Sequence, residues 1–313
     1  MEMQTTWMDR GHSMELGSAA RGDGLVTLFA ASRGGSIAVN TAAATLWLVL
    51  RGGAEFECRE GRFGLVAGDW ISLERESCPL VYAAGNGLVL GIALPAVHPA
   101  MSSYGKSAAV FPGRGRFQAR AAAFRAWRHA APFVRNETRT GVSAPHASSQ
   151  LLRFVAALQD DFGAMVHRCP GRSLRRKRQL FSRMQRACLH MEGHLGRITR
   201  ISELAEMASM SVWYFTKTFH AIYGQSPQAA SARIRLAHAA DLLLDTRLSV
   251  SEVGAACGFE NNCSFSRAFR ARFGLPPSLY RLRGGSSIDR SGKATGHVQP
   301  SSVFTGSVTW ASV

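Results

Sequence analysis

Acidic residues are scarce in this sequence of 313 residues. It holds 21 Asp and Glu against 37 Lys and Arg, which gives a formal net charge of +16. This charge argues against a partner or substrate surface that is itself cationic. The imbalance lies mainly in the C-terminal half, because residues 1–165 carry 16 basic and 13 acidic side chains whereas residues 166–313 carry 21 and 8. We therefore expect a polyanion to bind the C-terminal half.

Cysteine pairs and long apolar segments are also missing. The six cysteines form no C-x-x-C pair and no disulfide-dense spacing, which favours a reduced, cytoplasmic protein. No apolar run follows a basic start, so no secretory signal is visible. The longest uncharged stretch, residues 77–105, is broken by Gly and Pro into lengths typical of strands, and we expect no membrane segment.

Short apolar runs separated by glycine occupy residues 46–94. Strands about every 8–12 residues with turn residues between them indicate a small antiparallel barrel or sandwich. No G-x-G-x-x-G or G-x-x-x-x-G-K-[ST] phosphate loop interrupts the pattern. A nucleotide-binding sheet is therefore not expected here.

Helical spacing begins after Gly115. The apolar residues from Phe117 to Trp127 recur every three or four positions, and residues 151–165 predict a second helix. We expect residues 1–165 to form one domain, a sheet structure with a helical extension. The basic stretch 166–178 predicts an inter-domain linker, whose charges either face solvent or contact phosphates.

Residues 179–283 are helical by pattern and contain an internal repeat. Ile201–Ala205 matches Val250–Gly254, and Phe215–Gly224 matches Phe265–Gly274, at an offset of about 50 residues. Each copy predicts a short helix, a tight turn and a second helix that a polar residue opens. These openings are Ser211 in the first copy and Glu260-Asn261 in the second. The Gly/Ser/Thr-rich residues 284–313 are expected to be a disordered tail.

Helical periodicity assigns two faces to each second helix. The residues expected to face the core are Phe215, Phe219 and Ile222 in the first copy and Phe265, Ala268 and Phe269 in the second. The residues left outward are Trp213, Thr216, Lys217 and His220 in the first copy and Asn262, Ser266, Arg267 and Arg270 in the second. Arg matches the edge of guanine, Asn that of adenine, and hydroxyls bond phosphates or bases. An ordinary solvated face normally includes Glu and Asp, so this outward set favours DNA.

This region resembles the DNA-binding domain of AraC-type (AraC/XylS) bacterial transcription regulators, in which a long helix joins two helix-turn-helix units. The second unit carries the best match, from Val250–Val253 through Gly258-Phe259 and Phe265–Arg270 to Tyr280-Arg281, and the joining helix matches from Arg235-Leu236 onward. The resemblance implies that both second helices enter successive major-groove segments, roughly one helical turn apart.

The resemblance also implies roles for single residues. Trp213, Thr216 and Lys217, and in the second unit Asn262, Ser266 and Arg267, fall where the family contacts bases or phosphates. For Trp213 the alternative is a packing contact with a neighbouring helix. Ser209 occupies a turn position where glycine is common in the family, which predicts a strained turn.

Residues 40–95 resemble, less closely, the cupin-like effector domain that often precedes this DNA-binding domain, through the pattern Gly61-x-x-Gly64-x-x-x-Gly68-Asp69. The resemblance implies a barrel that either holds an apolar effector or serves only for dimerisation, and we favour the ligand pocket. Enzymatic cupins hold a metal with an H-x-H pair. No histidine lies between His12 and His98, which argues against a metal-dependent cupin reaction.

Two further features carry weaker signals. His190 and His194 lie four residues apart, as metal ligands on one helix face do, but the intervening glutamate is misplaced for H-E-x-x-H and no third ligand is evident. We expect paired surface histidines and no metal. Cys257 falls at an apolar helix position, so we expect core packing rather than oxidant sensing.

The sequence therefore predicts an α+β protein with an N-terminal antiparallel, cupin-like β-barrel and a C-terminal all-α domain of two helix-turn-helix units joined by a long helix. The expected function is that of a cytoplasmic, sequence-specific transcription regulator, an activator controlled through its N-terminal domain, without enzymatic activity or a cofactor. Expected partners are double-stranded promoter DNA, RNA polymerase, a small-molecule effector and a second copy of the chain, but no membrane. Two alternatives stay open: a cupin-type enzyme with a nucleic-acid-binding appendage, and a nonspecific polyanion binder.

Overall fold

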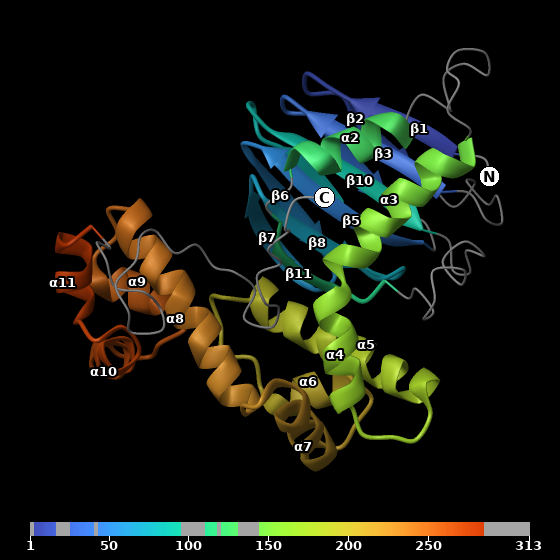
Figure 1. Cartoon of the computed structure of the whole chain (residues 1–313). Helices are drawn as coiled ribbons and strands as arrows, with labels where there is room; N and C mark the ends of the chain where they lie inside the picture. The colour runs from blue at the N-terminus through green and yellow to red at the C-terminus, as the bar shows by residue number, and fades with distance from the viewer. Residues whose placement is uncertain are drawn as a thin grey trace. The chain divides into compact units, whose positions relative to one another are not determined.

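The computed structural model describes residues 3–16, 26–40, 43–94, 110–117, 120–130 and 144–284. The tail expected at residues 284–313 lies outside these stretches apart from Gly284. The described chain divides into two compact units, the first ending at Leu189 and the second beginning at His190. The first contains sheets and helices and the second contains helices (Figure 1). The expected combination of an N-terminal sheet structure and a C-terminal helical domain is therefore present.

The strands of the first unit form two sheets. The six-stranded sheet has the order β1-β3-β10-β5-β8-β11, and the five-stranded sheet has the order β2-β4-β9-β6-β7. The strands are β1 (Met3–Met8), β2 (Ser13–Leu16), β3 (Val26–Ser32), β4 (Ser36–Val39), β5 (Ala44–Arg51), β6 (Gly53–Cys58), β7 (Gly61–Val66), β8 (Asp69–Leu73), β9 (Leu80–Ala83), β10 (Leu88–Leu94) and β11 (Gly113–Arg116). The glycine-punctuated strands expected over residues 46–94 pair antiparallel, as predicted.

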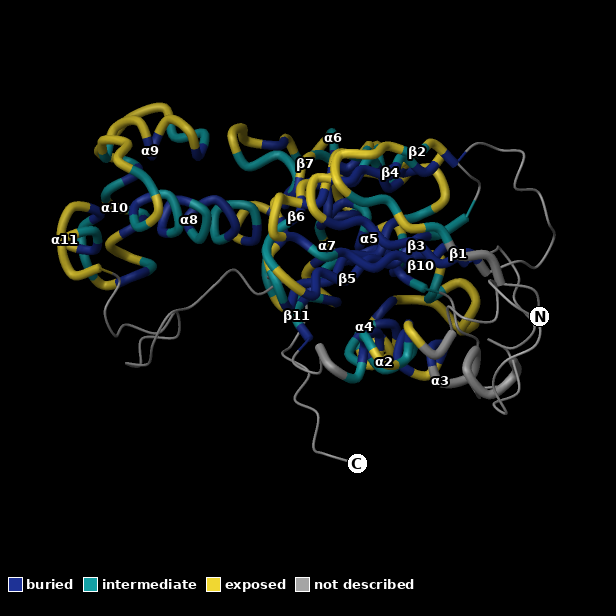
Figure 2. Tube along the Cα trace, turned by 90° about the horizontal axis from the view of Figure 1, so that it is seen from above, coloured by how far each residue is buried: buried dark blue, intermediate teal, exposed yellow. Residues whose placement is uncertain are grey.

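Aromatic side chains fill the space between the two sheets. The Trp47 ring stacks on Phe29 at a centroid distance of 5.6 Å and meets Phe56 edge to face at 5.9 Å. Gly91 is required beside Trp47, because a Cβ there would lie 2.5 Å from the ring. Strands β3, β5 and β10 lie in the part of the trace coloured as buried (Figure 2). Large side chains thus pack between the two sheets. The expected effector pocket stays a prediction.

The expected antiparallel barrel is wrong in two respects. Strand β1 runs parallel to β3, β2 runs parallel to β4, and the strands form two sheets rather than one closed barrel. The reason is that β1 and β3 each continue into a strand of the other sheet, through turns with positive φ at Arg10 and Arg33. Asp9 joins these turns by pairing with Arg33 and accepting a hydrogen bond from Ser32.

Helices α2 (Arg120–Ala130), α3 (Ala144–Leu158) and α4 (Asp160–Arg168) follow the sheets, and α2 and α3 lie across one face of the six-stranded sheet (Figure 1). Trp127 of α2 is buried and meets Trp7 of β1 edge to face at 6.1 Å. The single helix expected over 151–165 is broken at Gln159. The side-chain amide of Gln159 accepts a hydrogen bond from the backbone amide of Phe111 and donates one to the Phe111 carbonyl. These bonds connect the break between α3 and α4 to the segment just before β11.

Helix α5 (Leu174–Gly193) begins inside the segment expected to be a linker. The Ser173 hydroxyl accepts a hydrogen bond from the Arg176 amide at 3.3 Å, as an N-cap does. Lys and Arg favour helix, so the basic run continues the helix instead of breaking it. Glu74 then holds α5 on this unit by accepting a hydrogen bond from Ser182 and pairing with Arg186.

The second unit contains helices α6 (Ile201–Met207), α7 (Val212–Tyr223), α8 (Pro227–Asp245), α9 (Val250–Ala256), α10 (Asn262–Phe273) and α11 (Pro277–Leu282). Its core cluster joins residues of α8, α9, α10 and α11, Cys257 and Phe269 among them. Cys257 is fully buried in this cluster, which confirms its expected core role. This burial raises the pKa of its thiol to about 12. Within the described part of the chain, we find no helix with the length and apolarity of a membrane span.

Candidate nucleic-acid interface

The two helix pairs α6–α7 and α9–α10 share one turn geometry. In each turn, one amide bonds back five residues and the amide before it bonds back three, as in a Schellman motif. The bonds join Met210 to Ala205 and Ser209 to Glu206 in the first pair, and Phe259 to Gly254 and Gly258 to Ala255 in the second, at 2.8 to 3.0 Å. The turn residue has a φ of 54° at Ser209 and 72° at Gly258. Because a side chain is strained in this conformation, the strained turn predicted at Ser209 is confirmed.

A polar side chain opens each second helix. The Ser211 hydroxyl accepts a hydrogen bond from the amide three residues on at 3.3 Å, and the Asn261 side chain does the same at 2.8 Å. Both helices end at a left-handed glycine, Gly224 and Gly274. The polar openings expected from the sequence are confirmed, and caps at both ends give α7 and α10 the same length.

Buried rings fix which face of each helix is exposed. The side chains buried against the rest of the unit are Phe215, Phe219 and Ile222 of α7 and Phe265, Phe269 and Phe273 of α10. Ala268, also expected in the core, is half-buried and packs against the same cluster. The core face of both helices is therefore the predicted one.

The predicted outward residues of α7 lie at its surface. Trp213, Lys217 and His220 are exposed and Thr216 is half-buried. Trp213 is 69% exposed, so it does not fold back on a neighbouring helix. The Lys217 ammonium lies 4.9 Å from the centre of the Trp213 ring. This cation–π contact limits the freedom of the lysine side chain at the helix surface.

The predicted outward residues of α10 are similarly placed. Asn262, Arg267 and Arg270 are exposed and Ser266 is half-buried. The Arg267 guanidinium donates a hydrogen bond through Nε to the Cys263 carbonyl at 3.4 Å, a bond that does not involve its two outer nitrogens. Neither α7 nor α10 contains a carboxylate side chain. Each helix therefore presents donors and cations without a competing anion of its own.

Sequence reasoning missed Val212 and the structural role of Arg235. Val212 is 48% exposed in the first turn of α7, at the position of the repeat that corresponds to Asn262 in α10. Arg235 of α8 is buried, donates to the Cys257 and Gly258 carbonyls at 3.0 and 3.1 Å, and stacks on Phe259. Its position among the buried residues of the joining helix is the signal that could have pointed to a structural role. Arg235 holds the turn from which α10 starts.

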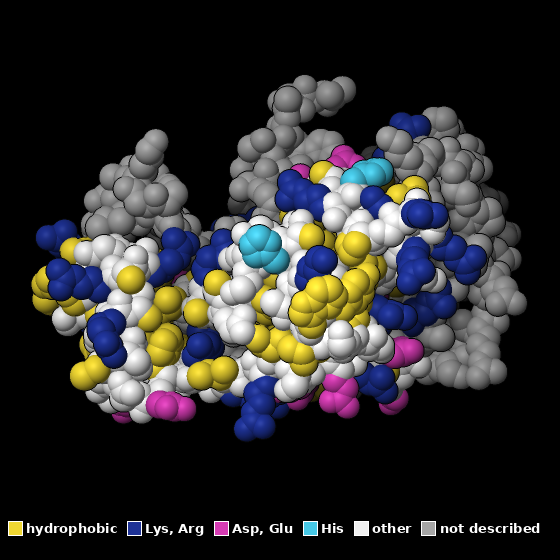
Figure 3. Space-filling model, turned by 90° about the horizontal axis from the view of Figure 1, so that it is seen from below, with side chains coloured by type: hydrophobic (Ala, Val, Ile, Leu, Met, Phe, Trp, Pro, Cys, Tyr) yellow, Lys and Arg dark blue, Asp and Glu magenta, His cyan; other side chains and the backbone are white. Residues whose placement is uncertain are grey.

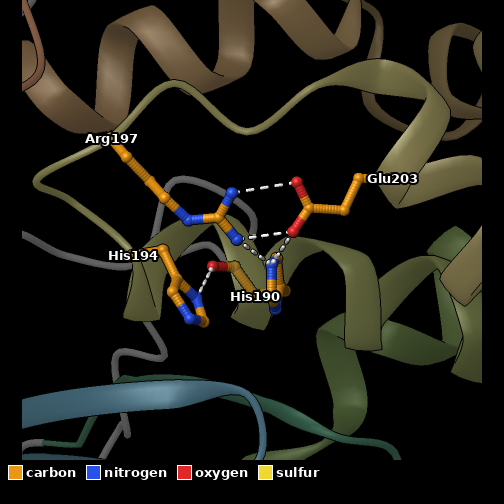
Figure 4. A network of polar contacts seen from close by, with 4 residues as sticks. All are labelled: His190, His194, Arg197 and Glu203. Carbon is orange, nitrogen blue, oxygen red and sulfur yellow. Dashed lines mark hydrogen bonds and ion pairs between the residues drawn. The ribbon is translucent and has the colours of Figure 1, made fainter.

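A polar network anchors α6 (Figure 4). Arg197 donates to both Glu203 carboxylate oxygens, at 2.9 and 2.5 Å, and His190 Nε2 lies 3.1 Å from one of them. These contacts lower the pKa of Glu203 to about 2, with the Arg197 hydrogen bond as the largest cause. The His194 ring lies 4.0 Å from that of His190, centre to centre. The network therefore connects the end of α5 to the first turn of α6.

The expectation of paired surface histidines is wrong for His190, which is 7% exposed. Burial is the largest cause that lowers its pKa below the ordinary value, and His194 and Arg197 add to it. The helix spacing that suggested a surface pair also places His190 against Glu203, which a single-helix pattern does not reveal. The described residues contain no group of three or more His, Cys, Asp or Glu side chains placed to hold a metal.

Comparison with known proteins agrees with this geometry. Residues 204–283 match the model of a helix-turn-helix domain. The chain is 32% identical over 105 residues to the HTH-type transcriptional regulator ExsA of Pseudomonas aeruginosa, an alignment that covers 33% of this chain and 38% of ExsA. It is 32% identical over 83 residues to the virulence regulon transcriptional activator VirF of Yersinia enterocolitica, covering 26% of this chain and 31% of VirF.

A solved structure is similar over the same share of the chain. It is that of a probable AraC family transcriptional regulator from Rhodopseudomonas palustris, with 32% identity and a TM-score of 0.31, covering 33% of this chain and 96% of that one. The match spans less than two fifths of the length of ExsA and VirF. The C-terminal part of this chain is thus a helix-turn-helix domain. The match agrees with the helix-turn-helix domain expected from the resemblance to AraC-type regulators.

The two turns give opposite expectations for their central residues. Ser209→Gly removes strain from a left-handed residue and is expected to raise the free energy of unfolding by up to about 1 kcal/mol. Gly258→Ala introduces that strain and also places a Cβ 3.2 Å from the Arg197 backbone, so a loss of about 1–3 kcal/mol is expected. Urea unfolding of the full chain measures both. A stable Gly258→Ala variant or a destabilised Ser209→Gly variant would contradict the shared turn geometry.

Acid is expected to destabilise the unit through His190. The pKa of His190 in the folded protein lies below the ordinary 6.5 of the unfolded chain. Its contribution to the free energy of unfolding is therefore fully present above pH 6.5 and is lost as the pH falls towards the folded-state pKa. Glu203, with a pKa of about 2, stays charged over this range. His190→Gln removes the titrating group and keeps a donor towards Glu203. Urea unfolding measures the difference in the free energy of unfolding between wild type and variant, which is expected to become smaller from pH 7.5 to pH 5. A difference that stays constant would contradict the role of His190 in the acid sensitivity.

Proposed function

We propose that the chain is a sequence-specific DNA-binding transcription regulator. Its helix pairs α6–α7 and α9–α10 act as two helix-turn-helix units, with α7 and α10 as the recognition helices. The observation that carries the proposal is the match of residues 204–283 to a helix-turn-helix domain, together with two exposed helix faces that lack carboxylates. The matched segment covers less than two fifths of ExsA and of VirF, so the activity of the whole chain is part of the proposal.

The side chains on α7 and α10 suit base edges and phosphates. Arg267 and Arg270 have the guanidinium groups that bond guanine or phosphate, and Asn262 has the amide that bonds adenine. Thr216 and Ser266 are short hydroxyl side chains that bond phosphates or either type of base. We assign the same interface to Trp213, Lys217 and His220 on α7. These eight residues are the proposed DNA contacts.

The joining helix suits a two-part site. Helix α8 has 19 residues, about 28 Å at the usual rise of an α-helix, which is comparable to the pitch of B-DNA. Two recognition helices on such a spacer suit two successive major-groove segments on one face of the duplex. We therefore propose a target with two blocks roughly one helical turn apart.

The first unit is the proposed regulatory part. Two face-to-face sheets with helices α2 and α3 on one of them form a separate compact unit, which supports a role apart from DNA contact. We propose that this cupin-like unit takes up an effector or pairs with a second copy of the chain, and so shifts which arrangement binds DNA. Activation through RNA polymerase, a location in the cytoplasm and the lack of enzymatic activity complete the proposal.

A pair of arginine variants tests the base-reading role. Arg267→Ala is expected to cost about 1–3 kcal/mol of binding free energy and to relax the preference at one base pair, since it removes a bidentate donor. Arg247→Ala, an exposed arginine between α8 and α9, removes the same charge and is expected to leave the sequence preference unchanged. Competition binding against every single-base variant of the target measures both. Equal effects of the two variants at all positions would contradict base contact by Arg267.

A further inference from the structure

A second cationic surface lies outside the helix-turn-helix domain, at the turn between α4 and α5. We call it the α4–α5 basic surface; its exposed members are Arg168, Arg172, Arg175, Arg176 and Arg183. Lys177 and Arg178 are half-buried beside them. The turn between α4 and α5 lies on the right in Figure 1. Figure 3, the view from below, shows Lys and Arg side chains gathered on the same side. All of these residues belong to the first unit.

Carboxylates are missing from the sequence segment that carries most of this surface. The sequence contains no Asp or Glu between Asp161 and Glu192. Glu74 contacts α5, but its two oxygens are engaged by Ser182 and Arg186. The first turn of α5 contains no acidic residue. The N-terminus of a helix carries a partial positive charge and usually favours acidic residues, so cations in the first turn of α5 are electrostatically unfavourable. An ordinary solvated face mixes both signs, so this surface differs from one.

Two of the exposed arginines are aligned along α5. Arg176 and Arg183 are seven residues apart, which places them on one face of α5 about 10 Å from each other along its axis. Arg172 lies in the turn that precedes α5. Double-stranded DNA carries one negative charge per about 1.7 Å of its axis, so a stretch of this length offers several phosphates.

The opposite face of α5 decides between two kinds of anionic partner. Phe181, Met184 and Cys188 are buried in the first unit, so they cannot enter a lipid surface without unfolding it. Binding to a membrane surface by a helix requires an exposed apolar face next to the cations. The α4–α5 basic surface has one exposed large hydrophobic residue among its described members, Leu174. A phosphate backbone, which needs only cations, fits this surface better.

We propose that the α4–α5 basic surface binds the phosphate backbone of DNA that flanks the site contacted by α7 and α10. This inference rests on the proposed function, because it assigns the flank of the same duplex to the first unit. It adds a sequence-independent contact that lies outside residues 204–283. The contact lengthens the bound segment and increases affinity without changing which bases are preferred.

Two triple variants of the full chain test this inference. The first replaces Arg172, Arg176 and Arg183 with Ala. The control replaces Arg59, Arg62 and Arg75, three exposed arginines of the β-strand region, of which Arg59 and Arg62 pair with Glu76 and Glu57. Both variants lose the same formal charge. Far-UV circular dichroism checks that both are folded. The probes are the DNA duplex selected by the wild-type chain, once with about 15 base pairs of flank on each side and once trimmed to the selected site, and a scrambled duplex of the longer length.

On the flanked duplex, the first variant is expected to bind about tenfold or more weakly at ~0.1 M salt, with a log–log salt slope reduced by about 2–3. The control is expected to match the wild type, and on the trimmed duplex all three proteins are expected to bind alike. Equal behaviour of the two variants on the flanked duplex would overturn the inference. An equal loss on the trimmed duplex would overturn it too, since no flank is then involved.

Failure of the proposed function is visible separately. It would appear as equal affinity of the wild-type chain for selected and scrambled duplexes. In that case the salt slopes of the two variants on the scrambled duplex still decide whether the α4–α5 basic surface contacts phosphates. A reduced slope for the first variant alone supports the contact, and equal slopes refute it.

Discussion

Burial of aromatic rings along one side of α7 and α10 is the constraint on which the proposed interface depends. In α7, Phe215 and Phe219 point into the core, and in α10 Phe265 and Phe269 do the same. Because of the helical period, the opposite face of each helix is then exposed. The turns before these helices fix where each one starts, and Arg235 holds the second turn through two carbonyls. The residues proposed to contact DNA are thus positioned by side chains that never reach it.

The two helix pairs share a backbone but differ in their exposed chemistry. The exposed face of α7 carries an indole with a lysine over it and an exposed valine, whereas that of α10 carries an amide and arginines. The first turn also holds a strained Ser209 where the second has Gly258. One chain therefore presents two unlike surfaces, which suits a target whose two blocks differ in sequence.

Much of the second unit could be predicted from the sequence, because its signals are local. Caps such as Ser211 and Asn261, the left-handed position of Ser209 and the core faces of both helices depend on residues a few positions apart. The missed features depend on contacts between distant segments. The parallel pairing of β1 with β3, the burial of His190 against Glu203 and the role of Arg235 involve partners that no local pattern identifies. Residues 174–178 are helical although a run of charges is also typical of a linker, so composition alone does not distinguish the two.

The central claim is that two helices of one chain contact base edges at once. Selection of duplexes from a random library by the full-length chain at ~0.2 M salt tests it most directly, because charge-driven nonspecific binding is weakened there. We expect a motif of two unlike blocks with centres roughly one helical turn apart. Recovery of no motif, by the full chain and also by residues 175–313 alone, would contradict it and leave a protein that binds polyanions without regard to sequence.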